Sequence, residues 1–292
     1  MSALEIDPCG STAAAAQAVA WTKQTIELSN GELLSARIHG RRRDDGTTPL
    51  VLHFHGGAFV GGSSKSGAPV AQLLAQAGSV VVSIDYPLAP AHPFPAAAEV
   101  GHAAALWLHR NRRRLGGADA VVLLAGDEAG GNLAAAVALM ARDRQRPPLG
   151  GQILLSPMLD PCLGTASLRE AEVGMRDCPW ARGWKSYLAQ VADAGHPYAV
   201  PAICMRLAQL APTLVVTAGD DPMRDEALAF AAKLRDAGVA VEQAVMASGT
   251  GWPLGYLQGA AQPDWPQALR DRLQRFIAAC RLAPSPKGDS RP

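Results

Sequence analysis

The sequence predicts an α/β fold with a mainly parallel sheet, helices on both faces and a small helical lid. Short runs that are apolar throughout, such as Val121 to Ala125, alternate with Ala- and Leu-rich runs of helical length, such as Asn132 to Arg144. Strands that are apolar throughout are buried on both faces, which is typical of parallel sheets between helical layers. The length of 292 residues suits one large domain of this kind.

The first part of the chain supplies six of the predicted elements and one rigid loop. A hairpin is indicated by Ser29-Asn30-Gly31 between two β-rich runs. Residues 86 to 95 hold four prolines, which forbid regular structure and predict an extended loop. The expected elements in this part are strands Thr25 to Leu28, Leu33 to His39, Pro49 to Phe54 and Val80 to Asp85, and helices Pro69 to Ala77 and Ala96 to Arg114.

The second part continues the alternation, with one interruption. Residues 162 to 201 mix aromatic and charged residues with helix-compatible segments, and we interpret them as a lid. We expect a single domain over residues 1 to 292, with lid elements at about 1 to 24 and 162 to 201 and a disordered tail at 283 to 292. The expected strands are Val121 to Ala125, Gln152 to Leu155, Thr213 to Thr217 and Val239 to Val245. The expected helices are Asn132 to Arg144, a helix that follows residue 226 and ends at about Ala237, and Pro266 to Ala279.

The composition argues against several classes of partner. A formal net charge of +1 with 18% charged residues leaves no overall field to attract nucleic acid or an anionic membrane. The arginines at 110 to 114 close a predicted helix, where cations suit the helix dipole. Five cysteines without a CxxC pair indicate neither a disulfide framework nor a zinc site, so we expect no cofactor or metal.

The expected location is the cytoplasm. The first 20 residues lack a basic segment followed by an apolar core, and no apolar run is long enough to span a bilayer. We expect a small-molecule substrate or ligand as the partner, and a homodimer remains open.

The segment Gly126 to Gly130 has the frame of a nucleophile elbow. It lies where a buried strand turns into a helix, and its flanking residues are small, as such a sharp turn requires. The central residue of the frame is Glu128, a carboxylate where an elbow normally carries a hydroxyl. The frame indicates a hydrolase, whereas the central residue does not.

Several ordered motifs over roughly Leu34 to Leu257 resemble the hormone-sensitive-lipase-like branch of the α/β-hydrolases, a group of carboxylesterases. These motifs are an HGGG-type loop at 55 to 59, a Pro-rich block at 85 to 97, the elbow at 126 to 134 and an acidic segment at 221 to 226. The resemblance implies backbone oxyanion donors at Gly56, Gly57, Ala58 and Ala129, and a triad acid at Asp221.

The same resemblance places Glu128 at the serine position and Thr250 at the histidine position, so that a pseudo-triad replaces the usual one. We therefore expect an enzyme that is not a Ser-His-Asp esterase. Thr250 and Trp252 are expected to line the substrate pocket, together with Trp184 and Tyr187 from the lid.

Three interpretations of Glu128 follow. It acts as an acid or base beside Asp221, it fills the oxyanion hole, or it attacks as a carboxylate nucleophile. We expect the first, which predicts non-hydrolytic lyase, isomerase or cyclase chemistry on a small carbonyl metabolite of secondary metabolism. The alternatives are a catalytically dead scaffold or ligand-binding protein, and a residual or carboxylate-nucleophile hydrolase.

Overall fold

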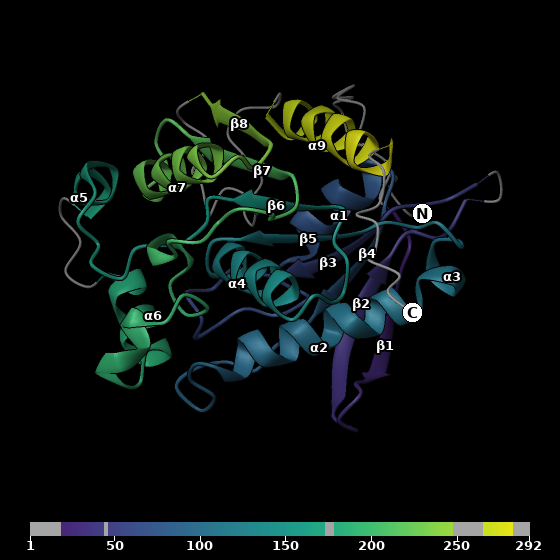
Figure 1. Ribbon diagram of the computed structural model, residues 1–292, viewed down its shortest axis with the longest axis horizontal. Helices are drawn as coiled ribbons and strands as arrows, with labels where there is room; N and C mark the ends of the chain where they lie inside the picture. The colour runs from purple at the N-terminus through teal and green to yellow at the C-terminus, as the bar shows by residue number, and fades with distance from the viewer. Residues whose placement is uncertain (1–18, 44–45, 173–177, 248–264, 283–292) are drawn as a thin grey trace, which may run out of the picture.

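One twisted sheet of eight strands forms the centre of the computed structural model, which describes residues 19–43, 46–172, 178–247 and 265–282 (Figure 1). The strand order is β1-β2-β4-β3-β5-β6-β7-β8, with β1 and β2 antiparallel and the later strands parallel. The strands are β1 Trp21–Glu27, β2 Leu33–His39, β3 Leu50–Phe54, β4 Val80–Ile84, β5 Val122–Asp127, β6 Gly151–Leu155, β7 Thr213–Ala218 and β8 Val241–Met246.

Helices cover both faces of this sheet, as the apolar strands require. Alternate residues of one strand enter different cores: Val51 belongs to the core that includes residues of α1 and α9, whereas Leu50 and Leu52 belong to the core that includes residues of α2, α4 and α7. The helices are α1 Ala68–Gln76, α2 Ala96–Arg110, α3 Arg112–Leu115, α4 Ala129–Asp143, α5 Ala166–Glu172, α6 Pro179–Tyr187, α7 Arg224–Asp236 and α9 Trp265–Leu282, with 3-10 turns at Val191–Gly195 and Pro201–Ile203.

The fold class predicted from the sequence is confirmed, and so is the opening hairpin, now β1 and β2. One boundary differs from the prediction. Residues 21–24, expected in an N-terminal lid element, begin β1 and pair with β2 at the edge of the sheet. Residues 1–18 and the tail 283–292 lie outside the described residues, so their assignments stay predictions, as does the single-domain division.

The parallel register brings the carboxyl ends of β3, β5 and β6 to one edge. Phe54 pairs with Gly126, and Asp127 pairs with Leu155, so the chain leaves all three strands at the same level. Helices α5 and α6 lie at this edge, whereas α3 lies at the opposite end of the sheet (Figure 1). Within the described part of the chain, no helix is both long and apolar enough to cross a membrane.

We expect Gly126→Ala to destabilise the fold by about 3 kcal/mol, because overpacking at a rigid backbone contact costs this much. A Cβ atom at residue 126 would lie 2.0 Å from the Gly130 carbonyl oxygen, where backbone cannot yield cheaply. Gly164→Ala is the matched control, since a Cβ atom there meets nothing within 4 Å. Urea unfolding of both variants measures the effect, and equal free energies of unfolding would contradict the prediction.

Candidate active site

Glu128 sits at the sharp turn between β5 and α4, in a backbone conformation with φ 54° and ψ −116°. A side-chain-bearing residue with positive φ is strained, and it persists only where its surroundings hold it. Here the Glu128 N–H donates to the Leu155 carbonyl at 3.0 Å, and the Glu128 carbonyl accepts from the N–H groups of Gly131 and Met158, each at 3.0 Å. Strand β6, the loop after it and the first turn of α4 therefore hold the Glu128 backbone in this conformation.

The Glu128 carboxylate is buried, and both of its oxygens are engaged. Oε2 accepts hydrogen bonds from the backbone N–H groups of Gly57 at 2.5 Å and Ala58 at 3.0 Å. Oε1 accepts from the indole Nε1–H of Trp180 at 2.7 Å. Two converging backbone donors on one oxygen form the geometry of an oxyanion hole. In this structure the hole is formed and holds the chain's own carboxylate.

Asp127 fixes the start of the oxyanion loop. Its Oδ2 accepts the Gly56 N–H at 3.0 Å, and its Oδ1 lies 3.1 Å from His53 Nε2. The other ring nitrogen of His53 lies 2.9 Å from Ser83 Oγ on β4. Gly56, expected among the oxyanion donors, is thus directed at Asp127 instead, because its N–H points to the neighbouring carboxylate.

Tyr86 supports the same loop from its other side. Its hydroxyl donates to the His55 carbonyl at 2.7 Å, and its ring stacks on the His55 ring with centroids 4.3 Å apart. His55 Nδ1 lies 2.8 Å from the Gly56 carbonyl oxygen. Burial lowers the pKa of His55, which favours the neutral ring in this position.

Helix α6 packs directly on the oxyanion loop. A Cβ atom at Gly183 would lie 2.2 Å from the Ala58 carbonyl oxygen, so glycine is required for this approach. Phe59 stacks on Tyr187 with ring centroids 4.0 Å apart and lies 5.0 Å from Trp184. This close packing of α6 on the loop brings Trp180, one turn before Trp184 on the helix, within hydrogen-bond distance of Glu128.

Trp184 and Tyr187, predicted to line the substrate pocket, are buried in this contact at 3% and 1% exposure. The Trp184 indole N–H and the Tyr187 hydroxyl are each buried without a hydrogen-bond partner among the described residues. Such groups carry a free-energy cost unless something pairs with them. Thr250 and Trp252, the other two residues predicted for this pocket, lie outside the described residues.

Asp221 follows β7 and is 1% exposed. Its carboxylate accepts hydrogen bonds from the hydroxyls of Thr217 and Ser156 and from the Met223 N–H, the last at 2.9 Å. Burial raises the pKa of Asp221, and these donors oppose the rise. The two oxygens are therefore held by β7, by the turn after it and by Ser156, which follows β6.

The expected pairing of two carboxylates in one pocket is not what the geometry provides. Both oxygens of Glu128 are engaged by the oxyanion loop and α6. Burial raises the pKa of Glu128 above its ordinary value, the Gly57, Ala58 and Trp180 donors lower it, and the charge of Asp127 raises it further. The remaining expected donor, Ala129, opens α4 directly after Glu128.

Three features of this site were not predicted from the sequence. Trp180 was interpreted as a lid aromatic that packs in the lid core or lines a ligand pocket, and its hydrogen bond to Glu128 was not predicted because it depends on how α6 packs. Asp127 and His53 were assigned no role, although the adjacency of Asp127 to the elbow centre offered a signal. Among the described residues, no group of three or more His, Cys, Asp or Glu side chains is placed to hold a metal ion.

A parallel sheet between helices, with an oxyanion loop after β3 facing a strand-to-helix elbow, defines an α/β-hydrolase. The sequence profile of the family described as alpha/beta hydrolase fold matches residues 51–250. The chain therefore belongs to the α/β-hydrolase family, in its hormone-sensitive-lipase-like branch.

Several of the similar proteins are named as esterases, and others are named as gibberellin receptors. Esterase LipI of Mycobacterium tuberculosis is 37% identical over 68% of this chain and 63% of its own length. Carboxylic ester hydrolase LipN of the same organism is 36% identical over 81% of this chain and 67% of its own. The chain thus spans about two thirds of the length of these relatives. A solved structure of a thermostable esterase from Pseudomonas putida is 28% identical, with a TM-score of 0.78 over 91% of this chain and 84% of that one.

These comparisons correct the functional expectation. Non-hydrolytic acid/base chemistry was predicted, but the relatives are named esterases and carboxylic ester hydrolases, which supports ordinary ester hydrolysis. The structure gives the physical reason, because the Glu128 carboxylate is hydrogen-bonded to the oxyanion loop and is not paired with Asp221 in one pocket, as the prediction required.

Glu128→Gln is expected to change how stability depends on pH. A carboxyl whose pKa is raised in the folded protein stabilises it most below the unfolded pKa of about 4.3, and this contribution is lost as pH rises through the folded pKa. The wild type should therefore lose stability relative to the variant above about pH 4.5, by at most about 1.4 kcal/mol per pH unit.

Urea unfolding of both proteins between pH 4 and 8 measures this difference. Asp221 and Glu226, whose pKa values are also raised by burial, titrate in both proteins and cancel in the comparison. A difference that stays constant over the whole interval would show that the Glu128 pKa is not raised.

Proposed function

We propose that the protein hydrolyses carboxylic esters at the Glu128 site. The observation that carries this proposal is the pair of N–H groups of Gly57 and Ala58 converging on a single carboxylate oxygen. Donors in this arrangement stabilise the negative oxygen that develops when an ester carbonyl is attacked. The names of the relatives favour the same substrate class.

We further propose that Glu128 occupies the family's nucleophile position and Thr250 its histidine position. A hydroxyl nucleophile and an imidazole base are then both absent from these positions, so attack falls to water. Glu128 is the group placed to accept the proton of that water once its carboxylate has left the oxyanion hole.

The reaction then runs in two steps. In the first, Glu128 takes a proton from water while the water oxygen bonds to the ester carbonyl carbon, and the carbonyl oxygen becomes an oxyanion held by Gly57 and Ala58. In the second, the oxyanion re-forms the carbonyl, the bond to the alcohol oxygen breaks, and that oxygen takes the proton back from Glu128. The products are a carboxylic acid and an alcohol.

The site is also proposed to bind a small-molecule ester through Trp184 and Tyr187. Their buried N–H and O–H groups lack partners among the described residues, so a polar atom of the substrate would satisfy them. A cytoplasmic location and a single domain with a lid at 162–201 remain part of the proposal.

Trp180→Phe should raise the hydrolysis rate of a short-chain aryl ester about tenfold. The variant keeps the ring but removes the N–H that holds Glu128 Oε1 at 2.7 Å, and a hydrogen bond to a charged group contributes about 1.5 to 3 kcal/mol. Steady-state release of the aryl alcohol at pH 8 measures the rate.

Glu128→Gln should lower that rate to the buffer background, because an amide cannot accept the proton. Trp21→Phe is the control for Trp180→Phe, since Trp21 starts β1 at the sheet edge. Equal rates for wild type and Glu128→Gln, or a wild-type rate no higher than buffer, would overturn the proposed function.

A further inference from the structure

Two arginine runs that are far apart in the sequence lie side by side at the end of the sheet away from α6. Arg42 Nη1 donates to the Arg113 carbonyl at 3.5 Å, which joins the β2–β3 connector to α3 (Figure 1). We define the arginine surface as the exposed residues of these two segments: Arg41, Arg42, Arg43, Arg110, Arg113 and Arg114.

These arginines make no ion pair with an acid of the described part of the chain. The contrast within the molecule is clear, because Arg142 and Arg144 are paired with Asp143 and Glu99 at 2.7 and 2.6 Å. Nearby in sequence are the acids Asp44, Asp45 and Asp119, which are fewer than the arginines. The net charge of +1 for the whole chain therefore conceals a local excess of positive charge.

Exposed apolar side chains flank the arginine surface. Trp21 is 47% exposed and pairs with His39, two residues before Arg41. At the end of α9, Leu282 is 83% exposed, and the preceding Arg281 reaches within 3.7 Å of the Cβ position of Gly46 in the same connector. Positive charge and exposed Trp and Leu side chains therefore occupy one end of the molecule.

We propose that this end of the protein binds the surface of an anionic lipid bilayer. Arginines bind lipid phosphates, while Trp and Leu side chains enter the boundary between headgroups and acyl chains. A nucleic acid would use the arginines alone and would not require a flanking leucine. Binding in this orientation leaves α6 and the Glu128 site turned away from the bilayer, toward the solution (Figure 1).

The test is co-sedimentation of the full chain with vesicles of phosphatidylcholine alone, or with 30 mol% phosphatidylglycerol, in about 50 and 300 mM salt. Binding should require phosphatidylglycerol and weaken in high salt, because screening shortens the reach of surface charge. Arg42→Glu/Arg113→Glu should weaken partitioning at least tenfold, since each arginine near an anionic surface is worth about fivefold.

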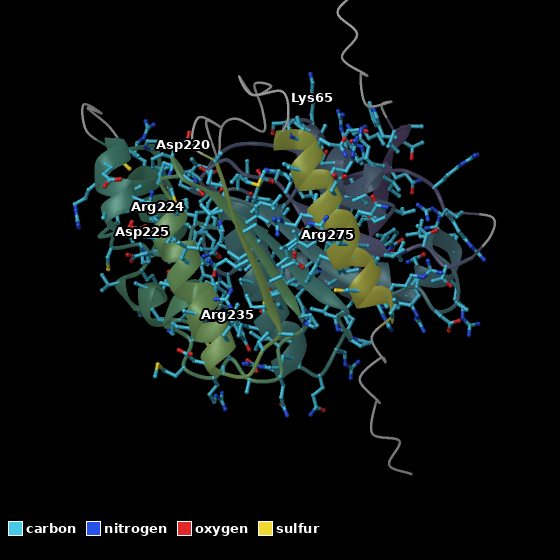
Figure 2. All side chains as sticks on the ribbon, turned by 90° about the horizontal axis from the view of Figure 1, so that it is seen from above. Lys65, Asp220, Arg224, Asp225, Arg235 and Arg275 are labelled. Atoms are coloured by element: carbon cyan, nitrogen blue, oxygen red, sulfur yellow. The ribbon has the colours of Figure 1, made fainter. Side chains whose placement is uncertain are left out.

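The matched control is Lys65→Glu/Arg235→Glu, which changes the net charge equally at exposed positions outside the arginine surface (Figure 2). This control variant should lose much less vesicle binding than Arg42→Glu/Arg113→Glu. Trp21→Ser and Leu282→Ser should each weaken vesicle binding severalfold and leave heparin or DNA binding unchanged. Equal losses in both double variants, no effect of the serine variants, or binding to DNA that exceeds binding to vesicles would overturn the proposal. Thermal melting confirms that each variant is folded.

Discussion

The hydrogen bonds from Gly57 and Ala58 to the Glu128 carboxylate are the interaction on which the site depends. They join the loop after β3 to the turn after β5, so the two segments that would bind an ester carbonyl are held together by the chain itself. A carboxylate oxygen resembles the oxyanion of ester hydrolysis in charge, which explains why the hole accepts it. The site is therefore assembled before any substrate arrives.

Holding that carboxylate in place requires support from several elements. The Asp127 carboxylate accepts a hydrogen bond from the Gly56 N–H, and the ring of His53 orients Asp127 through its other oxygen. Helix α6 packs closely enough on the oxyanion loop for Trp180 to donate a hydrogen bond to Glu128. This close packing requires glycine at position 183. The burial that results raises the pKa of Glu128, while the donors that fill the hole with its carboxylate oppose the rise.

Much of this could be predicted from the sequence, because the fold follows from local patterns. The apolar run Val121 to Ala125 predicts the strand that the structure places at Val122–Asp127, and the glycines of the elbow indicate a sharp turn. The direction of the Glu128 carboxylate could not be predicted, because it depends on whether donors from the oxyanion loop and α6 or the space beside Asp221 offer the lower free energy. Packing between distant segments decides that choice. The adjacency of the two arginine runs depends in the same way on the path of the β2–β3 connector.

The most direct test of the account is the amide proton chemical shift of Gly57 and Ala58 in wild type and in Glu128→Ala. If the carboxylate occupies the oxyanion hole, both amide protons resonate far downfield in the wild type, because short hydrogen bonds to a charged oxygen deshield the proton. The alanine variant should move both signals upfield, with the larger change at Gly57, whose bond is the shorter. Signals at the same position in both proteins would show that Glu128 does not fill the hole.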